Sequence, residues 1–215
     1  MDTYEKNLED FVHELKINGN SINVETTRSI LYQLANALKF LHEMNVIHRD
    51  LKPQNVLIRH NDDNLEVAIT DLGVSREITK TEKTNMTYQG TTLWMAPEVL
   101  QCKNKYGHPA DVFSFGLIAM YIKTGSKPID RSSSGCTYIF CTIYFGEHHV
   151  WTNIIYFFIK LEAKYSEWIE IREKSLESNQ LVDLVKKCLK LKSKLRPDKS
   201  ELVHHDFFDP TCEAE

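Results

Sequence analysis

The chain has 215 residues, 42% of them hydrophobic, which is enough to bury the core of one domain or slightly more. The formal net charge of -4 comes from 26 basic and 30 acidic residues and lacks the basic surplus typical of nucleic-acid binding, so no nucleic-acid partner is expected. Five irregularly spaced cysteines, no recognisable leader and uncharged runs of only about a dozen residues predict a cytoplasmic protein with no membrane segment in this chain.

The first half of the chain predicts a helix followed by a hairpin. Residues 26 to 44 place apolar side chains on one face at helical spacing, and Asn45 suits the end of such a helix. The segments 55–58 and 65–70 are apolar and flank the turn-rich "RHNDDN", which predicts two short strands joined by a longer loop.

The second half predicts mainly helices. Residues 110 to 124 are apolar nearly all round and end at Gly125, which indicates a helix buried in the middle of the core. Residues 180 to 191 carry one apolar stripe, and "DKSELVHHDFF" opens with Asp198 and Glu201 at the spacing of a capping pair. Between these helices, the apolar residues of the segment 131 to 160 recur at neither helical nor strand spacing, so no element is assigned there.

A dense polar stretch, "VIHRDLKPQNVLI" at residues 46 to 58, lies between the predicted helix and the hairpin. Pro53 excludes both a regular helix and a central strand there. A second isolated acid, Asp71, follows the second strand, and Gly73 permits a sharp turn after it.

The residue types in this region suit phosphate chemistry. The side-chain oxygens of Asn55 and Asp71, on adjacent loops, are what Mg²⁺ uses when phosphates supply its remaining ligands. Asp50 can accept a hydroxyl proton, and Lys52 can neutralise phosphate charge beside it.

Five motifs occur in the order found in the eukaryotic protein kinases: "HRDLKPQN", "DLG", "GTTLWMAPE", "DVFSFG" and the "RP" of "KLRPDKSEL". The chain resembles that family from about residue 1 to residue 209. The resemblance implies an α+β, protein-kinase-like fold in which the mainly α-helical large (C-terminal) lobe is present and the small lobe is absent. Residues 1–209 would form the hinge and that lobe, with 131–165 as an insertion or irregular segment and 210–215 as a tail.

The resemblance also assigns roles to individual residues. Asp50 would be the catalytic base, and Lys52 would contact the transferred phosphoryl group and mark the serine/threonine branch. Asn55 and Asp71 would hold Mg²⁺, with Lys52, Asn55, Asp71 and Leu57 next to the nucleotide. Thr91 would bond to the catalytic aspartate and lysine.

Other positions would form the scaffold or regulate the site. Glu98 and Arg196 are expected to form a buried ion pair. Asp111 would accept backbone hydrogen bonds from the loop at His48 and Arg49. Thr87 aligns best with the family's regulatory phosphorylation site, where a phosphate could pair with Arg49, and Leu72 replaces the usual Phe.

The function implied is that of a serine/threonine protein kinase, which uses ATP and Mg²⁺ to phosphorylate a protein hydroxyl. The 215 residues contain no G-x-G-x-x-G and no strand lysine with a helical Glu partner, so the small lobe is expected before Met1. This chain alone is therefore expected to be inactive and to need the missing lobe or a partner protein. The alternative is a non-catalytic, pseudokinase-like lobe that binds partners. Within the kinases, the chain resembles both the inositol-requiring stress kinases with ribonuclease L and the tyrosine-kinase-like group.

Overall fold

The computed structural model of the chain describes residues 4–61, 64–74, 76–77, 92–100, 107–128, 176–209 and 211. The predictions for Thr87, Thr91 and the segment 131–165 fall outside these residues.

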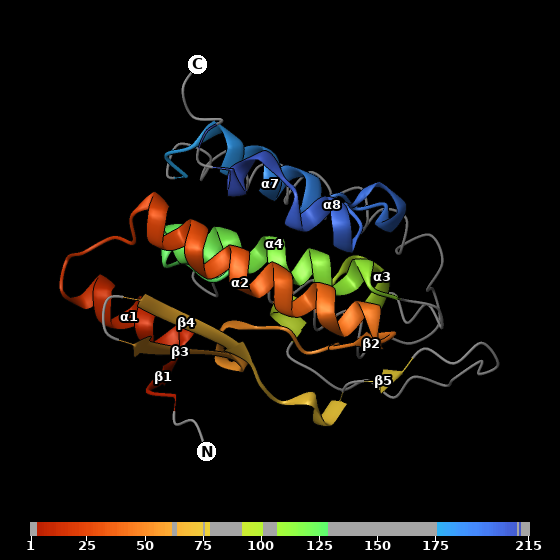
Figure 1. The fold of residues 1–215 in the computed structure, drawn as a ribbon, viewed down its shortest axis with the longest axis horizontal. Coiled ribbons are helices and arrows are strands. Elements are labelled where there is room, and N and C mark those ends of the chain that lie inside the picture. Colours follow the sequence, from red (N-terminus) through yellow and green to blue (C-terminus); the bar gives the residue numbers. More distant parts are fainter. Residues whose placement is uncertain are drawn as a thin grey trace, which may run out of the picture.

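The described part is mainly helical with little sheet, as the sequence predicts (Figure 1). Its helices are α1 (Leu8–Ile17), α2 (Val24–Glu43), α3 (Pro97–Leu100), α4 (Pro109–Thr124), α7 (Asn179–Cys188) and α8 (Lys199–Val203). Its strands are β1 (Lys6–Asn7), β2 (Val46–Ile47), β3 (Val56–Asn61), β4 (Asn64–Ile69) and β5 (Arg76–Glu77). Single 3-10 turns lie at Pro53–Asn55, Leu72–Val74, Thr92–Trp94, Ser193–Leu195 and Asp206–Phe208.

Helix α4 is the centre of the core. Every residue from Ala110 to Lys123 is buried, because α2 and α7 both pack against this helix (Figure 1). The helix ends at Gly125, whose φ of 58° is left-handed and whose N–H bonds to the Tyr121 carbonyl at 2.8 Å. The predicted buried helix and its glycine stop are both confirmed.

Helix α2 begins two residues before the predicted start. The side chain of Asn23 caps it by accepting the Thr26 N–H at 2.7 Å. At the other end, Asn45 adopts a φ of 57°, the left-handed conformation that turns the chain out of the helix and into the polar stretch.

The three-stranded antiparallel sheet has the order β1-β3-β4. Strands β3 and β4 pair from Val56 opposite Ile69 to Asn61 opposite Asn64, so the longer loop predicted between them is wrong. Arg59, at the start of that predicted loop, instead lies in β3 and forms an ion pair with Glu66 of β4 across the two strands.

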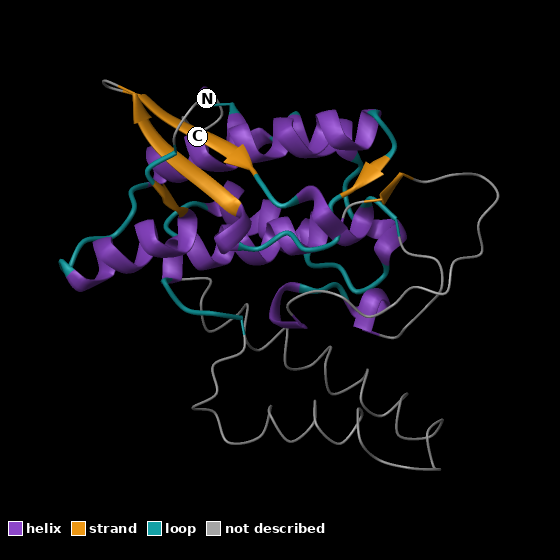
Figure 2. Ribbon diagram, turned by 90° about the horizontal axis from the view of Figure 1, so that it is seen from below, coloured by secondary structure: helices purple, strands orange, loops and turns teal. Residues whose placement is uncertain are grey.

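One side chain covers the outer edge of β4. Gln33 of α2 donates its amide N–H to the Leu65 carbonyl at 2.7 Å and accepts the Val67 N–H at 3.0 Å. The two-stranded ribbon of β2 and β5 lies apart from this sheet, towards the other end of α2 (Figures 1 and 2).

The two C-terminal helices agree with their sequence patterns. Helix α7 buries Leu181, Leu184, Val185 and Cys188 on one stripe. Helix α8 begins with a complete capping box formed by Asp198 and Glu201. Among the described residues, no helix has the length and apolarity that crossing a bilayer requires.

The contact between α4 and α7 is close at Gly116. A Cβ placed there would lie 2.7 Å from the Cys188 Cβ and 3.0 Å from Leu189 Cδ2. Burial also raises the pKa of the Cys188 thiol, so this cysteine serves as an unreactive core residue.

We expect Gly116→Ala to lower the free energy of unfolding by about 1–3 kcal/mol, because the added methyl group overpacks the α4–α7 contact. Alanine is intrinsically the better helix former, so intrinsic helix propensity predicts the opposite sign. The measurement is urea unfolding followed by circular dichroism. Gly107→Ala is the matched control, since its Cβ would meet only Pro109 Cδ at 3.8 Å. Equal stabilities of the two variants would contradict the close contact.

Candidate active site

The polar stretch leaves α2 through strand β2 and enters β3 through the 3-10 turn at Pro53–Asn55. We call residues 48–55 the catalytic loop. The loop is anchored at both ends by apolar residues, since Ile47, Leu51 and Val56 are all buried. Polar side chains are thereby held between two strands, as the sequence pattern predicts.

Two side chains bond to Asp50. The Lys52 ammonium donates to Asp50 Oδ2 at 2.5 Å. The Asn55 amide donates to the Asp50 carbonyl at 2.8 Å and to Asp50 Oδ2 at 3.3 Å. The Asp50 side chain is 10% exposed and that of Lys52 is 18% exposed, so the carboxylate is oriented by its neighbours yet accessible to a ligand.

The end of β4 lies against the same loop. The Thr70 N–H donates to the Asn55 carbonyl at 2.9 Å, and the buried imidazole of His48 donates from Nε2 to the Thr70 carbonyl at 2.9 Å. Asp71 is the next residue and is exposed. The structure therefore brings Asn55 and Asp71 onto neighbouring segments.

These residues fit a Mg²⁺ ion. Because the Asn55 amide nitrogen is used by Asp50, its oxygen is the atom left for a ligand. A Cβ at Gly73 would lie 3.3 Å from Asp71 Oδ1, so glycine leaves space beside that carboxylate. The described residues hold no cluster of three His, Cys, Asp or Glu side chains, and two oxygen donors suit an ion that takes its other ligands from phosphates and water.

Two site residues have unusual backbone conformations. Arg49 has a φ of 71° and Asp71 a φ of 61°, both in the left-handed region that costs energy for residues with a side chain. Arg49 directly precedes Asp50, and Asp71 is itself one of the two candidate Mg²⁺ ligands. Such conformations persist only where the surroundings hold them.

The buried carboxylate of Asp111, at the start of α4, holds Arg49 and its neighbour. Asp111 Oδ2 accepts the His48 N–H at 2.9 Å, and Oδ1 accepts the Arg49 N–H at 3.1 Å. These are the contacts expected from the sequence. A third partner, His42 Nε2 at 2.9 Å, was missed by sequence reasoning, although a histidine on the apolar face of a predicted helix was a usable signal.

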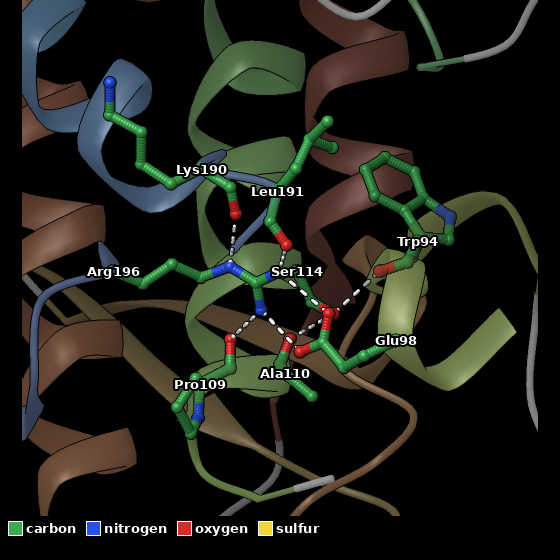
Figure 3. A network of polar contacts seen from close by, with 8 residues as sticks. All are labelled: Trp94, Glu98, Pro109, Ala110, Ser114, Lys190, Leu191 and Arg196. Carbon is green, nitrogen blue, oxygen red and sulfur yellow. Dashed lines mark hydrogen bonds and ion pairs between the residues drawn. The ribbon is translucent and has the colours of Figure 1, made fainter. Parts of the chain in front are cut away.

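Glu98 and Arg196 form a bidentate ion pair, with N–O distances of 2.6 and 2.8 Å (Figure 3). The guanidinium also donates to the carbonyls of Lys190, Pro109 and Leu191 and lies over the Phe113 ring.

A second contact holds the same segment to α4. Ser114 Oγ donates to the Trp94 carbonyl at 2.7 Å (Figure 3). Together with the ion pair, this bond fixes residues 94–98 against the central helix.

The remaining predicted site residues are placed as follows. Leu57 lies part-buried in β3, between Asn7 of β1 and Ala68 of β4. Leu72 is 49% exposed and is not part of the core. Gln54, which sequence reasoning also missed, donates to Glu9 of α1, and Glu9 in turn pairs with Lys127.

One histidine near the site has a shifted pKa. His108 precedes α4, and its ring stacks on His42 with centroids 4.3 Å apart and planes at 16°. The pKa of His108 is lowered to about 4, mainly by burial. The neighbouring His42 and Lys199 also lower this pKa, whereas the Asp111 carboxylate raises it.

We expect the ion pair of Glu98 and Arg196 to stabilise the fold. Arg196→Met should cost on the order of 3–5 kcal/mol of unfolding free energy, because it leaves a largely buried carboxylate unpaired. Arg59→Met is the control, since Arg59 also pairs with a glutamate but in a more exposed position, where the cost is about 0–1 kcal/mol. Urea denaturation of both variants measures the difference, and similar losses would argue against this role for the buried pair.

Acid should destabilise the protein through His108. The pKa of His108 is about 4 in the folded protein against 6.5 for a histidine in the unfolded chain, so the unfolded chain binds more protons between these two pH values. Stability should therefore fall as the pH falls from 6.5 to 4. His108→Phe should make the melting temperature less dependent on pH in this window, whereas exposed His13→Gln should not. An unchanged slope in His108→Phe would refute the assignment.

Comparison with known proteins gives matches along nearly the whole chain. The family model described as protein kinase domain matches residues 2–208. The chain is 30% identical over 203 residues to Cyclin-dependent kinase-like 2 of Oryctolagus cuniculus, covering 91% of this chain and 35% of that protein. It is 32% identical over 188 residues to Serine/threonine-protein kinase dst1 of Dictyostelium discoideum, covering 87% and 22%.

A third relative is the Phosphorylase b kinase gamma catalytic chain, liver/testis isoform, of Mus musculus, at 29% identity over 203 residues, covering 90% of this chain and 43% of that one. The chain thus spans between 22% and 43% of the lengths of these three relatives. The match along nearly the whole chain shows that it belongs to the eukaryotic protein kinase family.

Proposed function

We propose that the chain is the catalytic large lobe of a serine/threonine protein kinase, which transfers the γ-phosphoryl group of ATP to a serine or threonine hydroxyl of a protein. The observation that carries the proposal is the arrangement at Asp50, whose carboxylate is oriented by Lys52 and Asn55 in a loop fixed by Asp111. The relative whose printed name includes serine/threonine-protein kinase supports the substrate class.

Asp50 acts as the base. Its carboxylate accepts a hydrogen bond from the substrate hydroxyl and takes the proton as the hydroxyl oxygen bonds to the γ-phosphorus. The bond between that phosphorus and the oxygen bridging to the β-phosphate breaks, and ADP leaves with the bond's electrons. Lys52 stands beside the carboxylate and neutralises charge on the transferred group.

Asn55 and Asp71 would hold a Mg²⁺ ion through their side-chain oxygens. Mg²⁺, when bound there with the nucleotide, supplies charge neutralisation for the phosphates. Leu57 would contact the adenine face, and Thr91, which lies outside the described residues, is assigned by the family resemblance to a hydrogen bond with Asp50 and Lys52.

Regulation and completion of the site are part of the same proposal. A phosphate on Thr87, which lies outside the described residues, would pair with Arg49. The glycine-rich loop and strand lysine, which the 215 residues do not contain, come from a small lobe or a partner protein. The proposed setting is cytoplasmic.

The test is Asp50→Asn in the longest native polypeptide that contains these residues, identified by peptide mass spectrometry. We expect transfer of labelled γ-phosphate to a Ser/Thr peptide library to fall by more than roughly 10²- to 10⁴-fold, because positioning is lost together with the base. Asp206→Asn, an exposed acid on another element, is the matched control and should retain activity.

Two results would overturn the proposal. Equal activity of Asp50→Asn and the unsubstituted protein would remove Asp50 from the chemistry. No transfer by the native polypeptide, even with nucleotide and Mg²⁺ present, would favour the alternative of a non-catalytic, partner-binding lobe.

A further inference from the structure

The segment 186–199 is strongly basic. It runs from the last turns of α7 through the 3-10 turn at Ser193–Leu195 to the start of α8. Its fourteen positions hold seven of the 26 basic residues of the chain and a single acid, Asp198. Because the whole chain has a formal net charge of -4, this segment carries a charge opposite to that of the chain. Such a concentration creates a local positive potential on the surface.

Three of the seven cations are available to a partner. Four side chains of the segment already interact within the protein: Lys186, Lys187, Arg196 and Lys199. The other three, Lys190, Lys192 and Lys194, are exposed, and their ammonium groups form no ion pair or hydrogen bond among the residues that the structure describes. A partner can therefore use their charge without breaking an internal bond.

The backbone that carries these three lysines is fixed from within. The Arg196 guanidinium donates to the carbonyls of Lys190 and Leu191 at 2.7 and 3.3 Å. The Lys192 carbonyl accepts the Leu195 N–H at 2.9 Å. Figure 3 shows the Lys190 carbonyl turned towards the guanidinium and the Lys190 side chain pointing away from it. Binding would then order only side chains, which lowers its entropic cost.

An apolar side chain and a hollow lie beside the same lysines. Leu195 is 61% exposed. Together with Lys194 and Pro197, it lines a hollow of about 520 Å³ between α7, α8 and the 3-10 turn that follows α8. Two acids, Glu201 and Asp206, also line this hollow, so it is less positive than the loop beside it. The hollow suits an apolar group, and the loop suits anionic ones.

We propose that Lys190, Lys192, Lys194 and Leu195, with the adjoining hollow, form a docking site for an acidic segment of a partner protein. We call these four residues and the hollow the lysine surface. Aspartates or glutamates of the segment pair with the three lysines, and an apolar side chain among them packs on Leu195. A nucleic acid fits less well, because the rest of the chain is net negative and repels a long polyanion.

The lysine surface lies away from the catalytic loop. Figure 1 shows α7 and α8 on the opposite side of α2 and α4 from the strands. A segment docked there leaves Asp50 accessible. In a kinase, such a site would hold a substrate or a regulator at a distance from the reacting hydroxyl. That consequence rests on the proposed function, whereas the docking itself does not.

The experiment is fluorescence anisotropy on the full 215-residue chain. The probe is a fluorescein-labelled peptide rich in glutamate with one central leucine. The triple variant Lys190→Gln, Lys192→Gln and Lys194→Gln should bind this peptide roughly tenfold more weakly, because three individually weak exposed ion pairs are lost together. Added salt should weaken binding to the unsubstituted chain more than binding to the variant.

Two controls separate the lysine surface from overall charge. The triple variant Lys6→Gln, Lys39→Gln and Lys127→Gln removes the same net charge from β1, α2 and the turn after α4, and it should bind like the unsubstituted chain. A peptide with glutamine in place of every glutamate should not bind.

The apolar contact is tested by a double-mutant cycle. Leu195→Ser should weaken binding of the leucine peptide by roughly three- to tenfold. It should leave unchanged the affinity for a peptide with serine in place of the leucine. Because Leu195 is exposed, this variant should keep the urea midpoint of the unsubstituted chain.

Several results would overturn the proposal. Equal binding of the glutamate and glutamine peptides would do so, as would equal losses in the two triple variants or no effect of Leu195→Ser on the leucine peptide. Tighter binding of oligouridylate RNA or of phosphatidylserine vesicles at the same three lysines would assign the surface to another class of partner. None of these measurements requires ATP or Mg²⁺. A chain without kinase activity can therefore satisfy this proposal, and an active kinase can fail it.

Discussion

The carboxylate of Asp111 is the constraint on which the site depends. It is buried at the start of the central helix, and its two oxygens accept hydrogen bonds from two consecutive loop amides and one imidazole. A charge in that position is tolerable only while those donors remain in place. The loop therefore has one low-energy shape, and that shape includes the left-handed residue before Asp50. The Asp111 side chain thus links the buried start of α4 to the shape of the loop that precedes Asp50.

Helix α4 also fixes the other side of the site. Ser114 holds the Trp94 carbonyl, and the Pro109 carbonyl accepts from the guanidinium that binds Glu98 (Figure 3). The segments before and after the undescribed residues 78–91 are thus both tied to rigid elements, one through the β2–β5 ribbon and the other through α4.

The sequence predicted most of this arrangement for identifiable reasons. Helix α4 was predictable because a segment that is apolar all round must be buried, and a glycine follows its last residue. The motifs placed Asp50, Asn55 and Asp71 together because each occurs beside a predicted strand. The His42–His108 stack was not predictable from periodicity, since two rings 66 positions apart meet only through the packing of α2 against the start of α4. The length of the β3–β4 pairing was also missed, because "RHNDDN" has turn-forming composition while the cross-strand pairing of Arg59 and Glu66 favours strands.

The side chain of Gln33 has a consequence for how this sheet can grow. An exposed strand edge presents unpaired amide and carbonyl groups to any other extended chain. Here the amide of Gln33 occupies one carbonyl and one N–H of β4, two residues apart, in the manner of a neighbouring strand. A further strand could add on that side only after α2 withdrew this side chain. The same two bonds resist slippage of the hairpin, because a shift of one residue would turn its apolar face to water. Gln33 therefore blocks the pairing of another chain with this edge of β4 and also fixes the register of the hairpin.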